Sequence, residues 1–265
     1  MLYENLLRKP NISQSLVKEL RHEVCPRRIY GVYGLGLPTT PNDSQLRGIY
    51  FEYKLTGSCG KSGEPPQEPL QKNGKRYVDF ERLDQQAVFF REEIFPHYGI
   101  EVLGTDVVVS TGFNHPDTGE NIAVKCRLDV LGRVNGRLAV IDIKATADLA
   151  NGGWRNPLGL DHTQAYFYMW ALYQSESLNP EGVMPDFYYV VADWSPRMDY
   201  EVIKVEWNNG SFWDVRQAAT EAHERMKQMA AEEYPTRPSY QQCQGCPFAD
   251  TCPDRRQFKE VRVVW

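Results

Sequence analysis

The stretch Lys125-Cys-Arg-Leu-Asp129-Val-Leu-Gly-Arg-Val134-Asn-Gly136-Arg-Leu-Ala-Val-Ile-Asp142-Ile-Lys144 decides the fold of this chain. Its Asn-Gly pair separates two runs rich in β-branched residues. That pattern is the strongest short-range signal for a β-hairpin with a two-residue type I′ turn. In the register that such a turn imposes, Asp129 faces Asp142 and Arg127 faces Lys144.

The opposed acidic pair is the first functional signal. Cβ atoms of directly opposed residues lie about 4.5–5.5 Å apart, and like charges there destabilise a sheet. Two carboxylates are expected in that place when a cation lies between them. Because side chains alternate along a strand, Lys144 lies on the same face as Asp142. This face predicts a metal-dependent hydrolytic site, and a solvated polar face is the alternative.

Length and composition bound the class of protein. The 265 residues suit one large α/β domain, or one domain with an appendage. The net charge of -5 supplies no global basic field for nucleic acid, so any such binding must come from local clusters. Each cluster taken alone is better explained as a solvated face than as a binding site. The candidate clusters are Arg21, Arg27 and Arg28; Lys72, Lys75 and Arg76; and Arg255, Arg256 and Lys259.

The cellular setting follows from the absence of an apolar run of membrane length and of a signal-peptide core. We expect a cytoplasmic protein without a membrane partner, in a compartment where thiols stay reduced. The six cysteines are therefore interpreted as metal ligands or buried apolar residues rather than as disulfides.

Periodicity and turn residues predict the order of elements. Gly57 is expected to end the second helix, and residues 57–76 to form a mobile loop. The order fits one mixed sheet with helices on both faces. Helices are predicted at 13–24, 44–56, 79–94, 162–175 and 211–233, and strands at 102–110, 122–134, 137–144, 186–193 and 199–206.

The motifs resemble a known family. Asp129, then Asp142-Ile-Lys144, then Gln164-x-x-x-Tyr168, is similar to the RecB-like branch of the PD-(D/E)xK nuclease superfamily. Upstream, Gly48-Ile-Tyr-Phe-Glu52 resembles the helix that places a His or Glu beside the metal. Each motif alone arises often by chance, but the order of all four is specific. The resemblance implies an α/β restriction-endonuclease-like fold, a mixed central sheet flanked by helices.

The resemblance also implies roles for these residues. Asp129, Asp142 and the backbone carbonyl of Ile143 would bind Mg²⁺ or Mn²⁺, which prefer oxygen ligands. Glu52 would complete the ligand set, although a lone Glu on an amphipathic helix is usually solvated. Lys144 would orient or help deprotonate the attacking water and screen charge at the phosphorus.

Gln164 and Tyr168 share a helix face. The resemblance implies that they contact the DNA backbone or support the site. Alternatively, Asp161-His-Thr-Gln164 fits a helix-capping pattern, and Tyr168 lies in an aromatic run that is partly core. For His162 and the pair Trp154-Arg155, a structural role is at least as well supported as a functional one.

The cysteines suggest a second cofactor. Cys243-x2-Cys246-x5-Cys252 needs a fourth partner, and Cys25 is the natural candidate. One N-terminal cysteine with this C-terminal group resembles iron–sulfur nucleases, which include the CRISPR adaptation exonucleases and the AddB-type nucleases. The resemblance implies a [4Fe–4S] cluster that joins the two ends of the chain, with structural zinc as the rival.

Together these observations predict a divalent-metal-dependent DNA nuclease. We expect residues 1–233 to form its core and residues 234–265 a cysteine-bearing segment. By resemblance, it would be an exonuclease on single-stranded DNA or frayed duplex ends. The alternative is a non-catalytic or partner-dependent DNA-binding subunit. Protein partners would then come from recombination, phage replication or CRISPR spacer acquisition.

Overall fold

The chain folds as two units. The computed structural model describes residues 11–21, 24–37, 39, 41–60, 63–68, 71, 74–149, 154, 162–231, 243, 246, 248, 250 and 252. We call residues 41–110 with 126–212 the sheet unit, and residues 1–40, 111–125 and 213–265 the terminal unit. The predicted boundary at residue 233 stays a prediction.

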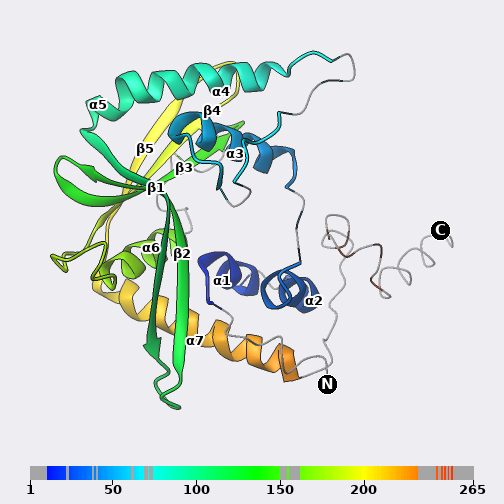
Figure 1. The fold of residues 1–265 in the computed structure, drawn as a ribbon, viewed down its shortest axis with the longest axis vertical. Coiled ribbons are helices and arrows are strands. Elements are labelled where there is room, and N and C mark those ends of the chain that lie inside the picture. Colours follow the sequence, from blue (N-terminus) through cyan, green and yellow to red (C-terminus); the bar gives the residue numbers. More distant parts are fainter. Residues whose placement is uncertain are drawn as a thin grey trace. The chain divides into compact units, whose positions relative to one another are not determined.

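A five-stranded mixed sheet runs through the chain in the order β1-β2-β3-β4-β5. The β2–β3 and β4–β5 pairs are antiparallel, whereas β3 and β4 are parallel. A parallel pair needs a crossover connection, and helix α6 lies in that connection (Figure 1). The strands are β1 (Ile100–Asn114), β2 (Asn121–Val134), β3 (Arg137–Thr146), β4 (Asp186–Asp193) and β5 (Tyr200–Val205).

The hairpin turn has the predicted geometry. Asn135 and Gly136 both take positive φ values, 50° and 81°, as a type I′ turn requires. The strands pair from Val134–Arg137 to Val130–Ile141, which is the predicted register. The described backbone pairing ends there, one step before Asp129 and Asp142. Beyond this point, the side chain of Asp129 accepts a hydrogen bond from the backbone of β3.

Helices cover both faces of the sheet unit. Helices α3 (Asp43–Thr56) and α4 (Val78–Phe89) lie on one side of β3 and β4, and α6 (Thr163–Tyr173) lies on the other (Figure 1). On the α6 side, the Tyr168 and Phe187 ring centroids are 6.4 Å apart. The π-helical turn η3 (Phe90–Ile94) and α5 (Phe95–His97) continue α4.

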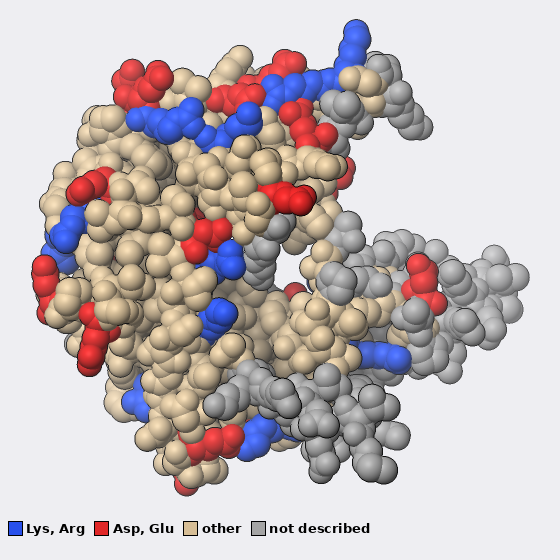
Figure 2. Space-filling model, in the orientation of Figure 1, with Lys and Arg blue, Asp and Glu red and all other residues tan. Residues whose placement is uncertain are grey.

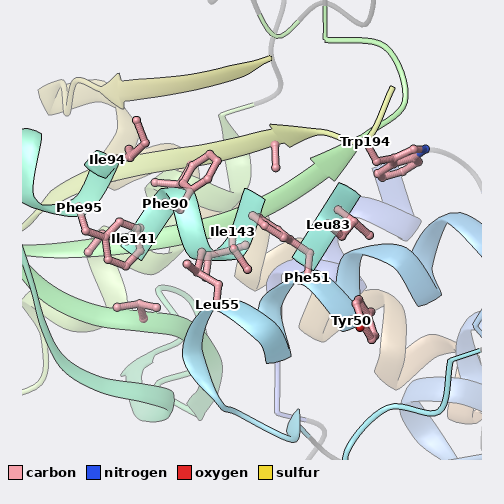
Figure 3. Close-up of a cluster of buried hydrophobic side chains, with 14 of the residues drawn as sticks. Tyr50, Phe51, Leu55, Leu83, Phe90, Ile94, Phe95, Ile141, Ile143 and Trp194 are labelled. Carbon is pink, nitrogen blue, oxygen red and sulfur yellow. The ribbon is translucent and has the colours of Figure 1, made fainter. Parts of the chain in front are cut away.

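The main core of the sheet unit lies between α3, α4 and the sheet (Figure 3). Each fully buried aliphatic or aromatic side chain contributes about 1.5–3 kcal/mol to folding. The core holds α3 in place relative to β3, and thereby sets where the outer side of α3 points. Its labelled members are Tyr50, Phe51, Leu55, Leu83, Phe90, Ile94, Phe95, Ile141, Ile143 and Trp194.

Helix α3 begins and ends where its sequence indicates. Asn42 and Gln45 form a reciprocal capping box, and Gly57 ends the helix with a φ of 75°. The amide of Gly57 donates to the Tyr53 carbonyl at 2.7 Å. The described residues of the following segment make contacts of their own. Ser58 bonds Asp106 on β1, and Arg76 forms an ion pair with Asp84 on α4 at 2.7 Å.

The terminal unit contains short N-terminal helices, the outer part of the β1–β2 hairpin and most of α7 (Asn209–Ala231). Ile12 joins the hairpin edge, donating to Ala123 and accepting from Lys125. Its N-terminal elements are α1 (Gln14–Arg21), α2 (Pro26–Ile29) and the π-helical turn η1 (Tyr30–Gly34). No helix in the described part of the chain is both long and apolar enough to cross a membrane.

Candidate active site

Asp142 lies at the centre of the site, on β3 where β2 separates from it. Its side chain is completely buried, with a relative exposure of 0%. The Oδ1 atom accepts a hydrogen bond from Gln164 Nε2 at 2.6 Å, and Oδ2 forms an ion pair with Lys144. The strand-mate Lys144 is therefore on the same face as Asp142, as the alternation predicted, with a side chain 30% exposed.

Asp129 replaces the backbone pairing at the end of the hairpin. Its Oδ2 accepts a hydrogen bond from the Ile143 amide at 2.9 Å. This bond sets the carboxyl group of Asp129 across from Asp142, although the described strand pairing stops at Val130–Ile141. The predicted juxtaposition of the two acids is therefore reached through a side chain, and the Ile143 amide becomes part of the site.

Glu52 reaches the same acidic group from helix α3. Its carboxyl is half-buried, and electrostatic repulsion couples it to Asp129, Asp106 and Asp142. Within the part of the chain that the structure describes, no hydrogen bond or ion pair reaches this carboxyl. Burial first, and then these acids, raise the pKa of Glu52 to about 8. A solvated helix-surface glutamate would not have this environment.

The site holds more carboxyl groups than Lys144 can neutralise. Burial raises the pKa of Asp142 to about 7, with Lys144 opposing the rise and Asp129 adding to it. Burial raises the pKa of Asp129 as well. For Lys144, burial disfavours the charge, but attraction to Asp142 and Asp129 outweighs it and raises the pKa. Without a metal, the site therefore holds protons that a cation can displace.

Gln164 and Tyr168 lie behind the acids on α6. Gln164 Nε2 bonds Asp142, and it also lies 3.3 Å from the hydroxyl of Tyr168. Tyr168 is only 9% exposed, and burial followed by the charges of Asp142 and Asp129 raises the pKa of its hydroxyl. These contacts hold Asp142 in place. The residue before α6 is His162, which makes no side-chain cap bond, and Asp161 lies outside the described residues.

The structure adds three residues that the sequence did not single out as functional. Asp106 accepts hydrogen bonds from Ser58 Oγ at 2.7 Å and from Arg127 Nη1 at 2.6 Å. Arg127 precedes Asp129 by two positions, so its place on the same strand face was readable. Its partner on β1 was not, because nothing local in the sequence relates residue 106 to residue 127.

Two other residues considered in the sequence, Trp154 and His162, lie against aromatic rings. The ring of Trp154 lies edge-on to Tyr189 with centroids 5.6 Å apart, and His162 lies 6.1 Å from the ring of Tyr166. Arg155 lies outside the described residues. These contacts are those of packed side chains.

The donor set of the site fits a hard cation. Asp129, Asp142 and Glu52 offer carboxylate oxygens, and Mg²⁺ or Mn²⁺ bind such ligands. The carboxyl of Glu52, without a described partner, is the group that a cation would satisfy. Among the residues that the structure describes, however, no three His, Cys, Asp or Glu side chains lie close enough together to hold an ion. Lys144 instead neutralises the Oδ2 atom of Asp142.

The cysteines of the predicted cluster are not assembled in the described structure. Cys25, Cys243, Cys246 and Cys252 are partly exposed, and the described residues contain no disulfide. No metal-binding group of three or more such ligands is found among the described residues. Cys126, outside the pattern, is buried, and burial raises the pKa of its thiol to about 12. It is a residue of the core.

A family comparison agrees with this geometry. The PD-(D/E)XK nuclease superfamily model matches residues 63–253, more than half of the chain, and the chain therefore belongs to this superfamily. The matched range includes the acids and lysine of β2 and β3 and begins after Glu52. No curated protein matches the chain.

Solved structures show likeness in fold. A candidate exonuclease from Eubacterium rectale, 17% identical, aligns with a TM-score of 0.58 over 96% of this chain and 91% of its own. An alkaline exonuclease from Laribacter hongkongensis aligns with a TM-score of 0.45 at 12% identity, over 86% of this chain and 93% of its own. At such identities only the first likeness bears on this chain, and it concerns the fold alone.

Proposed function

We propose that this nuclease is a divalent-metal-dependent deoxyribonuclease whose site comprises Asp129, Asp142, Lys144 and Glu52. The observation that carries the proposal is the buried acidic group around Asp142. Several carboxyl groups with raised pKa values share one lysine, and such an arrangement is costly unless a cation completes it. Because the chain belongs to a nuclease superfamily, the bond that it would cleave is a phosphodiester.

The residues divide the chemistry among them. Asp129, Asp142, Glu52 and the Ile143 carbonyl would hold Mg²⁺ or Mn²⁺. When bound, the cation would polarise the phosphoryl oxygen and lower the pKa of a water molecule. Lys144, protonated beside Asp142, would stabilise negative charge developing at the phosphorus. Gln164 positions Asp142 through its hydrogen bond, and Tyr168 supports Gln164.

Exonuclease action on single-stranded DNA or frayed ends is the proposed mode. It is supported by the RecB-like order of motifs and by the exonuclease description of the Eubacterium relative. Figure 2 shows basic and acidic side chains of the described residues interspersed on the visible face. We propose an intracellular location for this activity.

The cysteine segment is proposed to hold a [4Fe–4S] cluster. The support is the spacing of Cys243, Cys246 and Cys252 and the presence of Cys25. All four belong to the terminal unit. Residues 1–233 would then form the core, and residues 234–265 would contribute thiolates. Structural zinc is the alternative occupant of four such thiolates.

A cleavage assay tests the nuclease. Protein purified without oxygen is incubated with end-labelled linear and circular DNA, single-stranded and duplex, with Mn²⁺, Mg²⁺ or chelator. We expect metal-dependent loss of linear DNA that disappears in Lys144→Ala, since the charge beside the phosphorus is removed. The matched control is Lys204→Ala, which removes an exposed lysine paired with Asp186 on the same sheet. Equal cleavage by Lys144→Ala and the control would refute the site.

A second candidate function is a partner-dependent DNA-binding subunit of a recombination or spacer-acquisition complex. The ion pair between Lys144 and Asp142, which occupies an oxygen of a proposed metal ligand, favours it. Intact DNA binding without cleavage under every metal would support this function over an autonomous nuclease.

A further inference from the structure

Arg127 lies beside the acidic group but contributes no carboxylate to it. It lies on β2 two positions before Asp129, and so projects from the same strand face. Its side chain is 38% exposed. A guanidinium has five N–H donors, and within the described part of the chain only Nη1 is engaged, by Asp106 Oδ1 at 2.6 Å. The remaining donors are available to a ligand.

Asp106 holds Arg127 in a single place. It lies within strand β1 but has a φ of 58°, the left-handed region that Asp tolerates better than most residues and that still costs free energy. Its carboxylate accepts from Arg127 through Oδ1 and from Ser58 through Oδ2, and the Gly60 backbone amide is a further partner. Backbone strain of this kind is commonly kept where it positions a functional group.

One simpler role for this arrangement fits less well. Neutralisation of the acids is a poor sole reason for Arg127, because Asp106 cancels its charge. Asp106 also adds repulsion to Glu52 and Asp129. The pair contributes an oriented fork of donors rather than net positive charge.

We propose that Arg127 binds a backbone phosphate of the DNA strand next to the phosphate being cleaved, with Asp106 and Ser58 as positioning residues. Arginine suits this task because its planar fork matches phosphate oxygens in a bidentate manner. Ser58 lies two residues after the end of α3, so one short segment carries both Glu52 and the support for Arg127. The proposal rests on the proposed nuclease function.

Binding can be measured without cleavage. Fluorescence anisotropy of a labelled single-stranded oligonucleotide with Ca²⁺ in place of Mg²⁺ gives Kd at several salt concentrations. Loss of one phosphate contact in Arg127→Ala should weaken binding several-fold. It should also reduce the slope of log K against log salt by about 0.7 for a single strand. Arg127→Lys should restore the slope but leave KM raised, because a point charge cannot form the fork.

The matched control is Arg133→Ala, on the same strand about 20 Å further along, where Arg133 donates to the turn carbonyl of Gly136. It should leave Kd and slope unchanged. Asp106→Asn, which tolerates the same backbone, tests positioning: it should raise KM more than it lowers kcat, with the salt slope kept.

The outcomes separate this proposal from the nuclease assignment. If wild type cleaves DNA and folded Arg127→Ala keeps the wild-type KM and salt slope, the phosphate contact is refuted while the nuclease stands. If Arg127→Ala changes only the melting temperature, Arg127 is structural and the proposal fails. If wild type binds DNA without cleaving it, the nuclease fails, and the salt slope of Arg127→Ala still decides the contact. A wild type that binds no DNA overturns both.

Discussion

Glu52 carries an unfavourable charge in the site. In the folded chain its carboxyl is half-buried among other acids, which raises its pKa from 4.5 to about 8. A carboxyl with a higher pKa in the folded than in the unfolded chain binds more protons when folded. Its contribution to stability is therefore complete below pH 4.5 and is lost as the pH rises to about 8. A bound cation would reverse this loss by favouring the ionised form.

Glu52→Gln should therefore stabilise the metal-free protein at pH 8. The gain should be of the order of 1–2 kcal/mol, because Gln occupies the same volume without charge, and it should vanish at pH 4. Thermal unfolding with chelator at both pH values measures it. Glu81→Gln, at an exposed position on α4, is the control. A Glu52→Gln protein no more stable than wild type at pH 8 would contradict the electrostatic account.

The same substitution should cost activity. Removing one carboxylate ligand weakens metal binding, so a higher Mg²⁺ or Mn²⁺ concentration should be needed for half-maximal cleavage. Stability and activity would then move in opposite directions at one residue, as expected where a fold keeps an unfavourable charge for function.

At the scale of elements, the hairpin and β1 fix the spacing of the acids. Gly132 on β2 lies so close to β1 that a Cβ there would meet the Glu101 carbonyl at 2.5 Å and Ile141 Cδ1 at 2.9 Å. Both neighbours belong to the sheet, and the carbonyl is backbone that cannot move aside. By contrast, a Cβ at Gly48 within α3 would meet nothing within 4 Å.

Gly132→Ala should accordingly destabilise the protein by about 1–3 kcal/mol, since the sheet must shift to admit a methyl group. Gly48→Ala should stabilise it by about 0.5–1 kcal/mol, because Ala suits a helix interior better. Chemical denaturation of both variants provides the comparison. Equal stabilities would mean that β1 and β2 approach less closely at Gly132.

At the scale of the whole molecule, the proposed cluster would join residues far apart in the chain. Cys25 and the group from Cys243 to Cys252 lie near opposite ends of the sequence and belong to one unit. Thiolates that share an iron–sulfur cluster would link these ends covalently through the metal, restraining the unfolded chain as a long closed loop does.

Cys246→Ala should lose iron and acid-labile sulfide and should melt several degrees lower than wild type. Iron and sulfide analysis beside thermal unfolding, under anaerobic conditions, tests this. Cys59→Ala, outside the spacing pattern, should keep both iron and melting temperature. Zinc in place of iron in the wild-type protein would identify the rival site, and a metal-free wild type would argue against both.

Local features of this protein could be predicted from the amino-acid sequence alone. Asn135-Gly136 specified the turn and register, because few residues adopt two successive positive φ values. Strand alternation specified that Lys144 shares a face with Asp142, and Gly57 marked the end of α3. These features depend on neighbours within a few residues, where periodicity and backbone preference act directly.

Tertiary packing brings distant groups together, including Glu52 and Gln164, which the family resemblance had already associated with the site. Packing of α3 on the sheet brought Glu52 to the acids, and the left-handed backbone at Asp106 joined Ser58 to Arg127. The crossover through α6 placed Gln164 on Asp142. Contacts between residues tens of positions apart depend on how whole elements pack together, and no local pattern of residues encodes that.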